Sequence, residues 1–360
     1  MRSIKEISIE SKSGDYKLHF INNNKVQIEP DSVVVIDQKI LNQGLSLFPT
    51  GVRFIPIEVN EQRKSYNECG ILIEKLSELK ASRSTVIYAI GGGALQDITT
   101  FVSAIYMRGI RWNYVPSTLM SMIDSCIGGK SSINFKNSKN LIGNFYPPSE
   151  IYIHTKLLET LNSIDFSAGL AEGYKIAFAR GKSEFLEFKT LVDKYRSSGE
   201  IEYLEEAIEI SLLAKKWFIE IDEFDRSERQ LLNFGHSYGH ALEASTGFSI
   251  SHGIAVLIGM GAALVRSGID LQGNELMEVI VKEVSFCKDS IESIRIDKVQ
   301  FLKSLEKDKK NSDGFLRLIL PLDTGNLKVT EFILNEDSLL KCLADLESTL
   351  RILEVPYEVF

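Results

Sequence analysis

Three histidines in the second half of the chain could hold a divalent metal. His236 and His240 are four residues apart and would share one face of a helix, and His252 follows a loop and opens the next predicted helix. Imidazole nitrogen is a common ligand for zinc and related metals, and a carboxylate often completes the set. Glu172 in GLAEGYK, with Lys175 one turn away on the same predicted helix, is the candidate third ligand.

A glycine-rich turn, GGGALQD at 91–97, joins a predicted strand to a predicted helix. Its backbone N–H groups and the positive end of the helix dipole could bind a pyrophosphate. The dinucleotide pattern G-x-G-x-x-G is met at Gly91 and Gly93, but Gln96 stands where the last glycine belongs. The turn is therefore either an anion site or a purely structural turn.

A second glycine turn, DSCIGGKSS at 124–132, presents Lys130 close to Asp124. A Walker A loop would need a glycine where Asp124 stands, so the P-loop class is excluded. Lys130 is either a phosphate ligand or a solvated surface cation. Further cations are scattered along the chain, and each by itself indicates only a solvated charge: Arg108, Lys139, Lys215, Arg229 and the DKK motif at 308–310.

The elements that must position these residues change in type along the chain. Strand-like and helix-like segments alternate in the first part, which is typical of a parallel sheet covered by helices. We predict strands at 32–37, 51–59, 85–90, 112–115 and 151–154, and a helix at 65–79. Long amphipathic helices follow, at 166–180, 183–195, 201–221, 229–245 and 253–267, with one strand-like interruption at 314–321 and a helical tail. We expect an α/β domain at 1–162 and a mainly helical domain at 163–360.

Composition limits the classes of function. Of the 360 residues 44% are hydrophobic and 25% are charged, and the formal net charge is −8, which argues against a nucleic-acid or membrane-surface protein. The N-terminus has no apolar core of a signal peptide, and no apolar run has membrane-spanning length. Four scattered cysteines with no pairing pattern indicate free thiols. We expect a cytoplasmic protein.

The ordered motifs of this chain resemble those of the 3-dehydroquinate synthases, a family of sugar phosphate cyclases. The resemblance runs from about 60 to 320, and its main blocks are NEQRK (60–64), GGGALQD (91–97), YMRG (106–109), VPST (115–118), DSCIGGKSSIN (124–134), KNLIGNFYPP (139–148), GLAEGYK (169–175), RQLLNFGHSYGHALEA (229–244), SHGIAV (251–256) and DKK. It implies a dehydroquinate synthase-like fold: an α/β N-terminal nucleotide-binding domain with a parallel sheet, and a mostly helical C-terminal metal and substrate domain.

The resemblance also implies a set of site residues. NAD would be held in the N-terminal domain by Asp37, Glu61, Lys64, Gly92, Gly93, Asp97, Ser117, Thr118, Lys130, Lys139, Leu157 and Thr160. A divalent metal, Zn2+ or Co2+, would be held by Glu172, His236 and His252. The catalytic and substrate residues would be Arg108, Asp124, Lys130, Asn140, Lys175, Lys215, Arg229, Asn233, His240 and Lys310, the last taken in preference to Lys309.

The implied activity converts 3-deoxy-D-arabino-heptulosonate 7-phosphate to 3-dehydroquinate and phosphate in the shikimate pathway, by a homodimer that uses NAD catalytically. Several positions depart from the family pattern. Gln96 stands where glycine is usual and brings a side chain close to the nucleotide; the other departures are Gly173, Tyr174, Asp225 and Ile254. Three alternatives stay open: a cyclase for another sugar phosphate, a glycerol-dehydrogenase-type polyol dehydrogenase, and a non-catalytic homologue.

Overall fold

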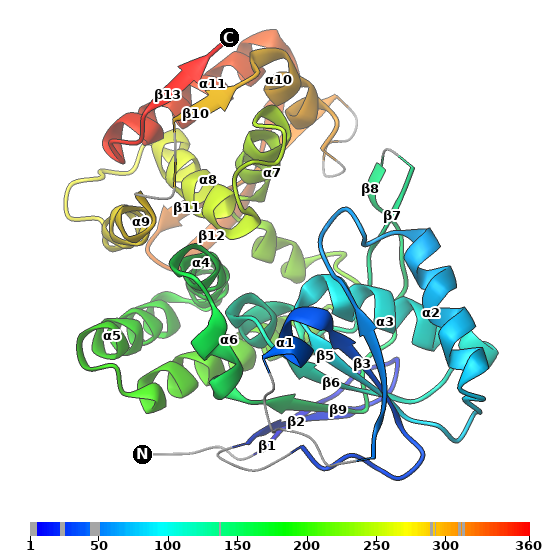
Figure 1. Ribbon diagram of the computed structural model, residues 1–360. Coiled ribbons are helices and arrows are strands. Elements are labelled where there is room, and N and C mark those ends of the chain that lie inside the picture. Colours follow the sequence, from blue (N-terminus) through cyan, green and yellow to red (C-terminus); the bar gives the residue numbers. More distant parts are fainter. Residues whose placement is uncertain are drawn as a thin grey trace. The chain divides into compact units, whose positions relative to one another are not determined.

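Two compact units make up the chain (Figure 1). The computed structural model describes residues 6–21, 26–43, 51–136, 138–288, 291, 293–308, 311 and 314–360. The first unit comprises Met1–Thr160 together with Lys216–Glu223, and the second comprises Leu161–Lys215 and Phe224–Phe360. The segment that returns to the first unit is the last part of one long helix and the residues that follow it.

A seven-stranded sheet forms the centre of the first unit. Its strand order is β1 (Glu6–Ile9), β2 (Tyr16–Phe20), β9 (Glu150–Ile153), β6 (Trp112–Pro116), β5 (Ile87–Gly91), β3 (Val33–Asp37) and β4 (Arg53–Ile57). Only β1 pairs antiparallel, and all other neighbours in the sheet run parallel. The five predicted strands and the parallel sheet are confirmed, whereas the N-terminal hairpin β1–β2 was not predicted.

Buried β-branched and aromatic residues explain the central strands. In β3 the run from Val33 to Ile36 is buried, and β5 and β6 are buried at every position, as expected of parallel strands covered on both faces. The helices of this unit are α1 (Gln38–Asn42), α2 (Tyr66–Glu78) and α3 (Gly93–Ile105). Shorter elements are η1 (Tyr106–Arg108), the π-helix η2 (Ser121–Ser125), η3 (Thr155–Thr160) and the hairpin of β7 (Ile133–Phe135) with β8 (Ser138–Ile142).

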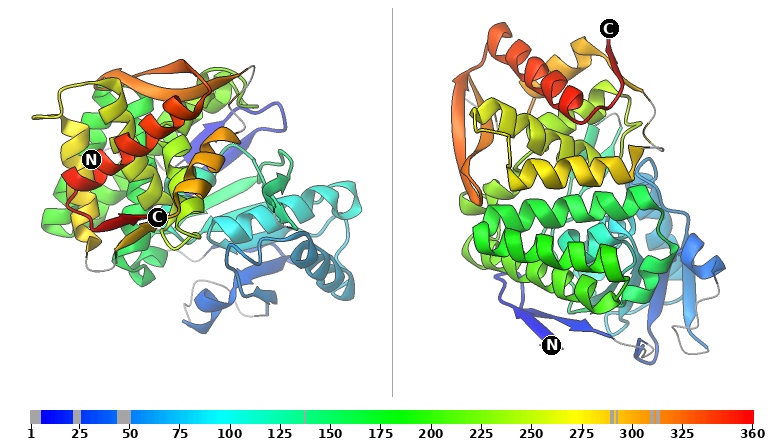
Figure 2. Two further views of the ribbon diagram at one scale, coloured as in Figure 1. Left: turned by 90° about the horizontal axis from the view of Figure 1, so that it is seen from above. Right: turned by 90° about the vertical axis from the view of Figure 1, so that its left-hand side faces the viewer.

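Helices dominate the second unit. They are α4 (Ser163–Arg180), α5 (Lys182–Ser198), α6 (Ile201–Ile221), η4 (Glu228–Asn233), α7 (His236–Ser245), α8 (His252–Ser267), α9 (Glu275–Phe286), α10 (Lys298–Glu306) and α11 (Glu336–Ile352). Figure 2 shows α4 and α5, in green, lying side by side in its right-hand view. The last residues of α6 belong to the first unit.

Two parts of the helical prediction were wrong. The helix expected at 229–245 is two elements, η4 and α7, because Gly235 adopts a left-handed φ of +76° between them. The second unit also holds more strand than the single segment expected. An antiparallel pair joins β11 (Phe315–Asp323) to β12 (Asn326–Ile333), and a parallel pair joins β10 (Ile294–Ile296) to β13 (Tyr357–Val359) in the tail.

Helix α8 is the core of the second unit. Its residues from Gly253 to Leu264 are all buried, and it packs against α4, α7 and α11. A helix that is apolar on every side is expected at such a central place. The residue that begins α8 is His252, as the sequence predicted, so this rigid helix fixes the backbone of one candidate metal ligand.

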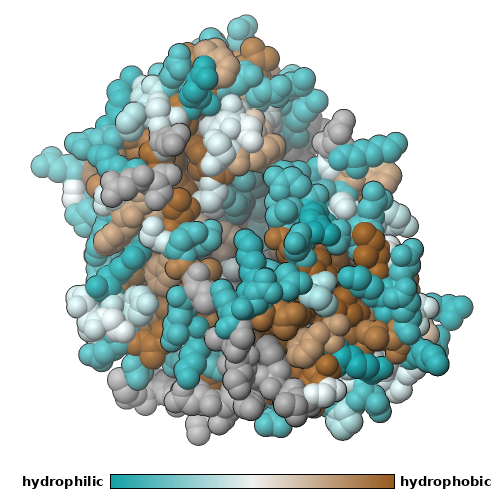
Figure 3. Space-filling view, viewed as in Figure 1, coloured by the Kyte–Doolittle hydropathy of each residue, from teal (hydrophilic) through white to brown (hydrophobic). Residues whose placement is uncertain are grey.

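The surface agrees with the composition. Polar and charged residues cover much of the face seen in Figure 3, with apolar residues between them, as on ordinary globular proteins. Among the described helices, none combines the length and apolar character that crossing a membrane would require. All four cysteines are buried and free, so the prediction of unpaired thiols is confirmed.

Candidate functional site

Three side chains of the second unit converge on one point. Glu172 lies in the middle of α4 and is 1% exposed, while His236 and His252 are the first residues of α7 and α8. Glu172 Oε1 lies 3.8 Å from His236 Nε2 and 3.5 Å from His252 Nε2. The helices therefore bring together the three residues predicted as metal ligands.

Hydrogen bonds orient both imidazole rings toward that point. His236 Nδ1 lies 3.2 Å from the carbonyl oxygen of Phe234, and His252 Nδ1 lies 3.0 Å from Glu243 Oε2. Both partners are acceptors at neutral pH, so each Nδ1 carries the proton, and in the neutral ring Nε2 keeps its lone pair. This is the tautomer that a metal ligand needs, with its outer nitrogen held by a second group.

A hydrogen bond also fixes one of the two carboxylate oxygens of Glu172. Lys175 Nζ donates a hydrogen bond to Oε2 from one turn further along α4, and both side chains are almost fully buried. Oε1, in contrast, is buried and makes no hydrogen bond. A buried carboxylate oxygen without a partner is costly, and a bound cation would remove that cost. The donor set of one oxygen and two nitrogens suits Zn2+ or Co2+.

Close packing of glycines holds the two histidine-bearing helices at a short separation. A Cβ added to Gly259 of α8 would lie 2.2 Å from the carbonyl oxygen of Gly235, just before α7. A Cβ on Gly253, beside His252, would lie 2.1 Å from the carbonyl oxygen of Ala168 in α4. Side chains larger than hydrogen cannot fit at these two positions without moving α8 away from α7 or α4.

His240 belongs to the same cluster. Ligand atoms of His236, His240 and His252 lie within 4.8 Å of one another, and the rings of His240 and His252 are stacked with centroids 5.6 Å apart. A three-histidine metal set is therefore a geometric alternative to the set with Glu172. His240 is the most exposed of the three histidines.

Glu243 is a functional candidate that the sequence reading missed. Burial lowers the pKa of His252, but the hydrogen bond to Glu243 and the charges of Glu172 and Glu243 outweigh it, so this pKa lies above its ordinary value. The spacing of His236, His240 and Glu243 at i, i+4 and i+7 places all three on one face of α7. That periodicity was available in the sequence as a signal.

We predict that Glu243→Gln lowers zinc affinity roughly 10- to 100-fold, because a neutral amide supports the metal-bound ring less than a carboxylate does. Competition with a chelator of known affinity measures the change on the purified protein. Glu278→Gln, at an exposed position of α9, is the matched control and should bind zinc normally. Unchanged zinc affinity in Glu243→Gln would show that Glu243 does not support the ligand.

In the first unit, the carboxyl ends of parallel strands place the predicted nucleotide residues along one sheet edge. Asp37 ends β3, Gly92 and Gly93 follow β5, and Thr118 lies just beyond β6. Ligands of open parallel sheets bind at this kind of edge. Gly92 comes close to the next loop, since a Cβ there would lie 3.0 Å from Thr118 Cγ2. Leu157 lies in η3, which follows β9.

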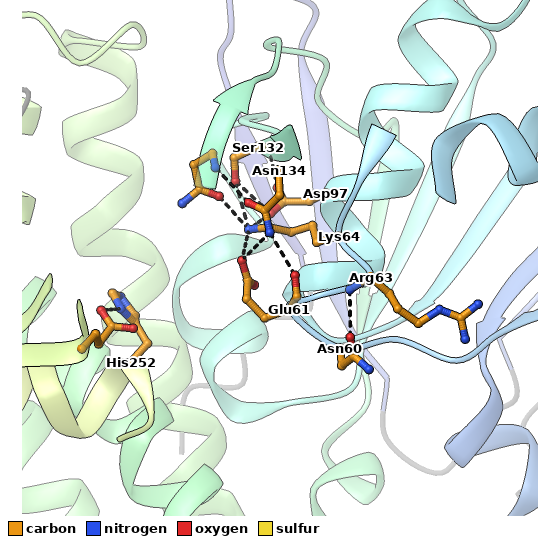
Figure 4. A network of polar contacts seen from close by, with 10 residues as sticks. Asn60, Glu61, Arg63, Lys64, Asp97, Ser132, Asn134 and His252 are labelled. Carbon is orange, nitrogen blue, oxygen red and sulfur yellow. Dashed lines mark hydrogen bonds and ion pairs between the residues drawn. The ribbon is translucent and has the colours of Figure 1, made fainter. Parts of the chain in front are cut away.

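A polar network surrounds Lys64, which is 6% exposed (Figure 4). Its Nζ lies 2.8 Å from Asn140 Oδ1, 3.1 Å from Asp97 Oδ2 and 3.3 Å from Glu61 Oε1. Ser132 completes the network, with its backbone N–H donating to Asp97 Oδ1 at 2.9 Å and its hydroxyl to Oδ2 at 3.0 Å. Burial raises the pKa of Asp97 above its ordinary value, and Lys64 and Ser132 oppose that rise.

This network joins residues that the sequence had assigned to different ligands. Glu61, Lys64 and Asp97 were predicted for NAD, whereas Asn140 was predicted among the catalytic and substrate residues. Asn140 has a φ of +52° and its N–H donates to Asn134 Oδ1 at 2.9 Å, so the β7–β8 hairpin presents its amide directly to Lys64. The residues predicted for NAD and the one predicted for the substrate therefore form a single polar network around Lys64.

The other predicted residues divide between the two units. In the first unit, Arg108 lies in η1, Asp124 in η2 and Lys130 in the loop after η2. Ser117 and Lys139 also belong to this unit. Lys175, Lys215, Arg229, Asn233 and His240 lie in the second. Lys215 and Arg229 are buried cations, at 6% and 3% exposure. Lys309, Lys310 and the side chain of Thr160 lie outside the described residues.

Sequence comparison gives matches along most of the chain. Residues 54–168 match the family model described as 3-dehydroquinate synthase N-terminal, and 169–311 match 3-dehydroquinate synthase C-terminal. A 3-dehydroquinate synthase of Dictyoglomus turgidum is 36% identical over 303 residues, 83% of this chain and 84% of the relative. One from Helicobacter pylori is 32% identical over 353 residues, 94% of this chain and 99% of the relative.

Solved structures show the same fold at lower identity. The 2-epi-5-epi-valiolone synthase of Streptomyces hygroscopicus, with NAD+ and Zn2+ bound, has a TM-score of 0.79 at 21% identity and covers 98% of this chain and 99% of its own. A 2-deoxy-scyllo-inosose synthase complexed with carbaglucose-6-phosphate, NAD+ and Co2+ has a TM-score of 0.78 at 19% identity. The match covers 95% of this chain and 99% of the synthase. Glycerol dehydrogenase of Schizosaccharomyces pombe has a TM-score of 0.58 at 15% identity, and the match covers 90% of this chain and 84% of the dehydrogenase. The predicted fold class is confirmed.

Proposed function

The chain belongs to the 3-dehydroquinate synthase family, and we propose that its first unit holds NAD and its second a divalent metal for this family's reaction. The function is that of a 3-dehydroquinate synthase, a phosphate-eliminating lyase of the shikimate pathway. The observation that carries the metal assignment is the buried, unpartnered Glu172 Oε1 that faces Nε2 of both His236 and His252.

The substrate we propose is 3-deoxy-D-arabino-heptulosonate 7-phosphate, which carries a phosphate and a carboxylate. NAD, held by the first unit, would supply reversible oxidation of one ring hydroxyl, and the metal, held by Glu172, His236 and His252, would supply a Lewis acid that acidifies this hydroxyl. The neighbouring C–H would become acidic, and its proton would pass to the departing phosphate as the C–O bond breaks. The ketone would be reduced again by the hydride taken up in the first oxidation, and ring opening and aldol closure would give the carbocycle. The sequence is redox-neutral, so NAD is not consumed.

The residues of the second unit would hold the charges of the substrate. We assign His240, Lys175 and Asn233 to the region beside the metal, and Lys215 and Arg229 to the carboxylate. Both of the latter are buried, and buried cations form stronger hydrogen bonds with an anion than solvated ones do. Their presence supports the heptulosonate over sugar phosphates that lack the carboxylate.

The residues of the first unit would hold NAD and part of the phosphate. Helix α3 begins at Gly93 directly after the sheet edge, so its N-terminal N–H groups are suited to the pyrophosphate. Glu61, Lys64 and Asp97 would orient the nucleotide, and Arg108 and Lys130 would stabilise the departing phosphate. The homodimer and the cytoplasmic location are proposed from the family resemblance alone.

Phosphate release with defined substrates tests the proposal. Purified protein with NAD and zinc is expected to release phosphate from the heptulosonate phosphate and to form a product that dehydroquinase converts to an ultraviolet-absorbing enone. A heptulose 7-phosphate without the carboxylate and a hexose 6-phosphate should give at most about 1% of that rate, because neither control substrate carries the carboxylate that we assign to Lys215 and Arg229. Faster turnover of either control substrate would assign the chain to another cyclase reaction.

A further inference from the structure

Gln96 forms two hydrogen bonds with a single residue outside its own helix. It lies in the first turns of α3, is 3% exposed, and its Nε2 donates to the backbone carbonyl oxygen of Ser125 at 2.6 Å. In return Ser125 Oγ donates to Gln96 Oε1 at 2.7 Å. The side chain expected to approach the nucleotide is thus engaged with the last residue of the π-helix η2.

The next residue of α3 holds the other end of the same loop. Asp97 accepts two hydrogen bonds from Ser132, and Gln96 holds Ser125, so adjacent positions of one helix fix both ends of residues 125–132. We call this segment the lysine loop, because Lys130 lies in it. Asp124 directly precedes it.

Other contacts hold the middle of the lysine loop. The N–H of Gly128 donates to Tyr16 Oη at 2.8 Å, and the carbonyl oxygen of Gly129 accepts from the N–H of Tyr146 at 2.7 Å. Gly128 and Gly129 have φ angles of +103° and +63°, and residues other than glycine rarely adopt such values. A loop with such a backbone depends on fixed ends to keep one conformation.

We infer that Gln96 is a positioning residue that acts through Ser125 to hold Asp124 and Lys130 in their working conformation. The inference rests on the proposed function for the roles of Asp124 and Lys130. Loss of the amide would leave the carbonyl of Ser125 without its donor. A displacement of about 1 Å in a catalytic group can lower turnover about 100-fold, so the effect should fall mainly on turnover and only slightly on NAD binding.

Four variants test the inference. Gln96→Leu removes both hydrogen bonds at similar volume, Ser125→Ala removes only the hydroxyl bond, and the double variant removes both partners. Thr99→Val is the matched control, since the buried Thr99 hydroxyl on the same helix has no hydrogen-bond partner. For each folded protein we would measure kcat and KM at saturating NAD, and the Kd of NAD by titration.

Gln96→Leu is expected to lower kcat about tenfold or more while the Kd of NAD changes less than about threefold. Ser125→Ala should lower kcat about fivefold, and the double variant should have a kcat no lower than that of Gln96→Leu. The kcat of Thr99→Val should equal that of the unaltered protein. A weaker Kd for NAD with normal kcat would mean that Gln96 serves the nucleotide instead. Lower thermal stability with normal kcat and KM would reduce it to a structural role, and either result overturns the inference.

Amide hydrogen exchange separates this inference from the proposed function. Exchange of residues 125–132 should become faster in Gln96→Leu and Ser125→Ala than in Thr99→Val, whichever substrate the enzyme uses. If the heptulosonate phosphate is not turned over but exchange rises as expected, the proposed function fails and the role of Gln96 in fixing the lysine loop stands. Unchanged exchange in both variants would contradict that role directly.

Discussion

A His236→Ala variant is expected to bind zinc more than about a hundredfold more weakly than the unaltered protein and to lose phosphate release with it. Loss of an outer-shell partner alone costs roughly 10- to 100-fold in affinity, and this substitution removes a candidate ligand itself. The two remaining donors, Glu172 and His252, cannot complete the usual three-ligand catalytic site. Chelator competition measures the affinity, and a phosphate assay measures the activity.

Two further variants decide which residues complete the ligand set. Glu172→Gln should lose zinc as His236→Ala does, because the amide is a poor zinc ligand, whereas His240→Ala should keep zinc and lose turnover. The reverse outcome would establish the three-histidine set that the geometry also allows. His19→Ala, in strand β2 of the first unit, is the histidine control and should bind zinc normally. Zinc bound at full affinity by His236→Ala would place the metal elsewhere.

A Gly259→Ala variant is expected to lose about 3 kcal/mol of the free energy of unfolding, as overpacking of a tight contact does, and its zinc affinity should fall as well. The added Cβ would lie 2.2 Å from the carbonyl oxygen of Gly235 and 2.9 Å from the backbone nitrogen of Gly239. Backbone atoms cannot rotate aside as a side chain can, so α8 must move away from α7. His252 then moves relative to His236, and the metal site opens.

Gly70→Ala is the matched control for this prediction. Gly70 lies inside helix α2, and a Cβ there meets nothing within 4 Å. Alanine is favoured over glycine in helices by about 1 kcal/mol, so this variant should be slightly more stable than the unaltered protein. Urea unfolding of both variants, with and without zinc, provides the comparison. Equal stability of Gly259→Ala and Gly70→Ala would contradict the tight α7–α8 packing.

Strong periodic patterns allowed much of the fold to be predicted from the sequence. The buried runs of β3, β5 and β6 and the amphipathic segments of α4, α5 and α6 appear where they were expected. The β7–β8 hairpin was missed because β8 is exposed at four of its five positions and has no apolar alternation to reveal it. The helix expected at 229–245 is interrupted before α7 because Gly235 is needed for a turn and for the approach of α8.

The candidate site was predictable only where its residues share an element or a motif. His236 and His240 are recognisable by their helical spacing, and Glu172 was a candidate carboxylate that the family resemblance then also implied. Glu243 was missed because its partner, His252, begins another helix. The joining of Asn140 to Lys64 depends on a hairpin fold and a positive φ, which the sequence did not indicate.

The central claim is that this chain eliminates phosphate from its substrate in a redox-neutral reaction. The most direct test follows phosphate and NADH together in one reaction of the purified protein with the heptulosonate phosphate, NAD and zinc. We predict many molecules of phosphate released per active site, with no net accumulation of NADH. Accumulation of NADH with glycerol-like alcohols, together with no release of phosphate, would contradict the claim and indicate a polyol dehydrogenase.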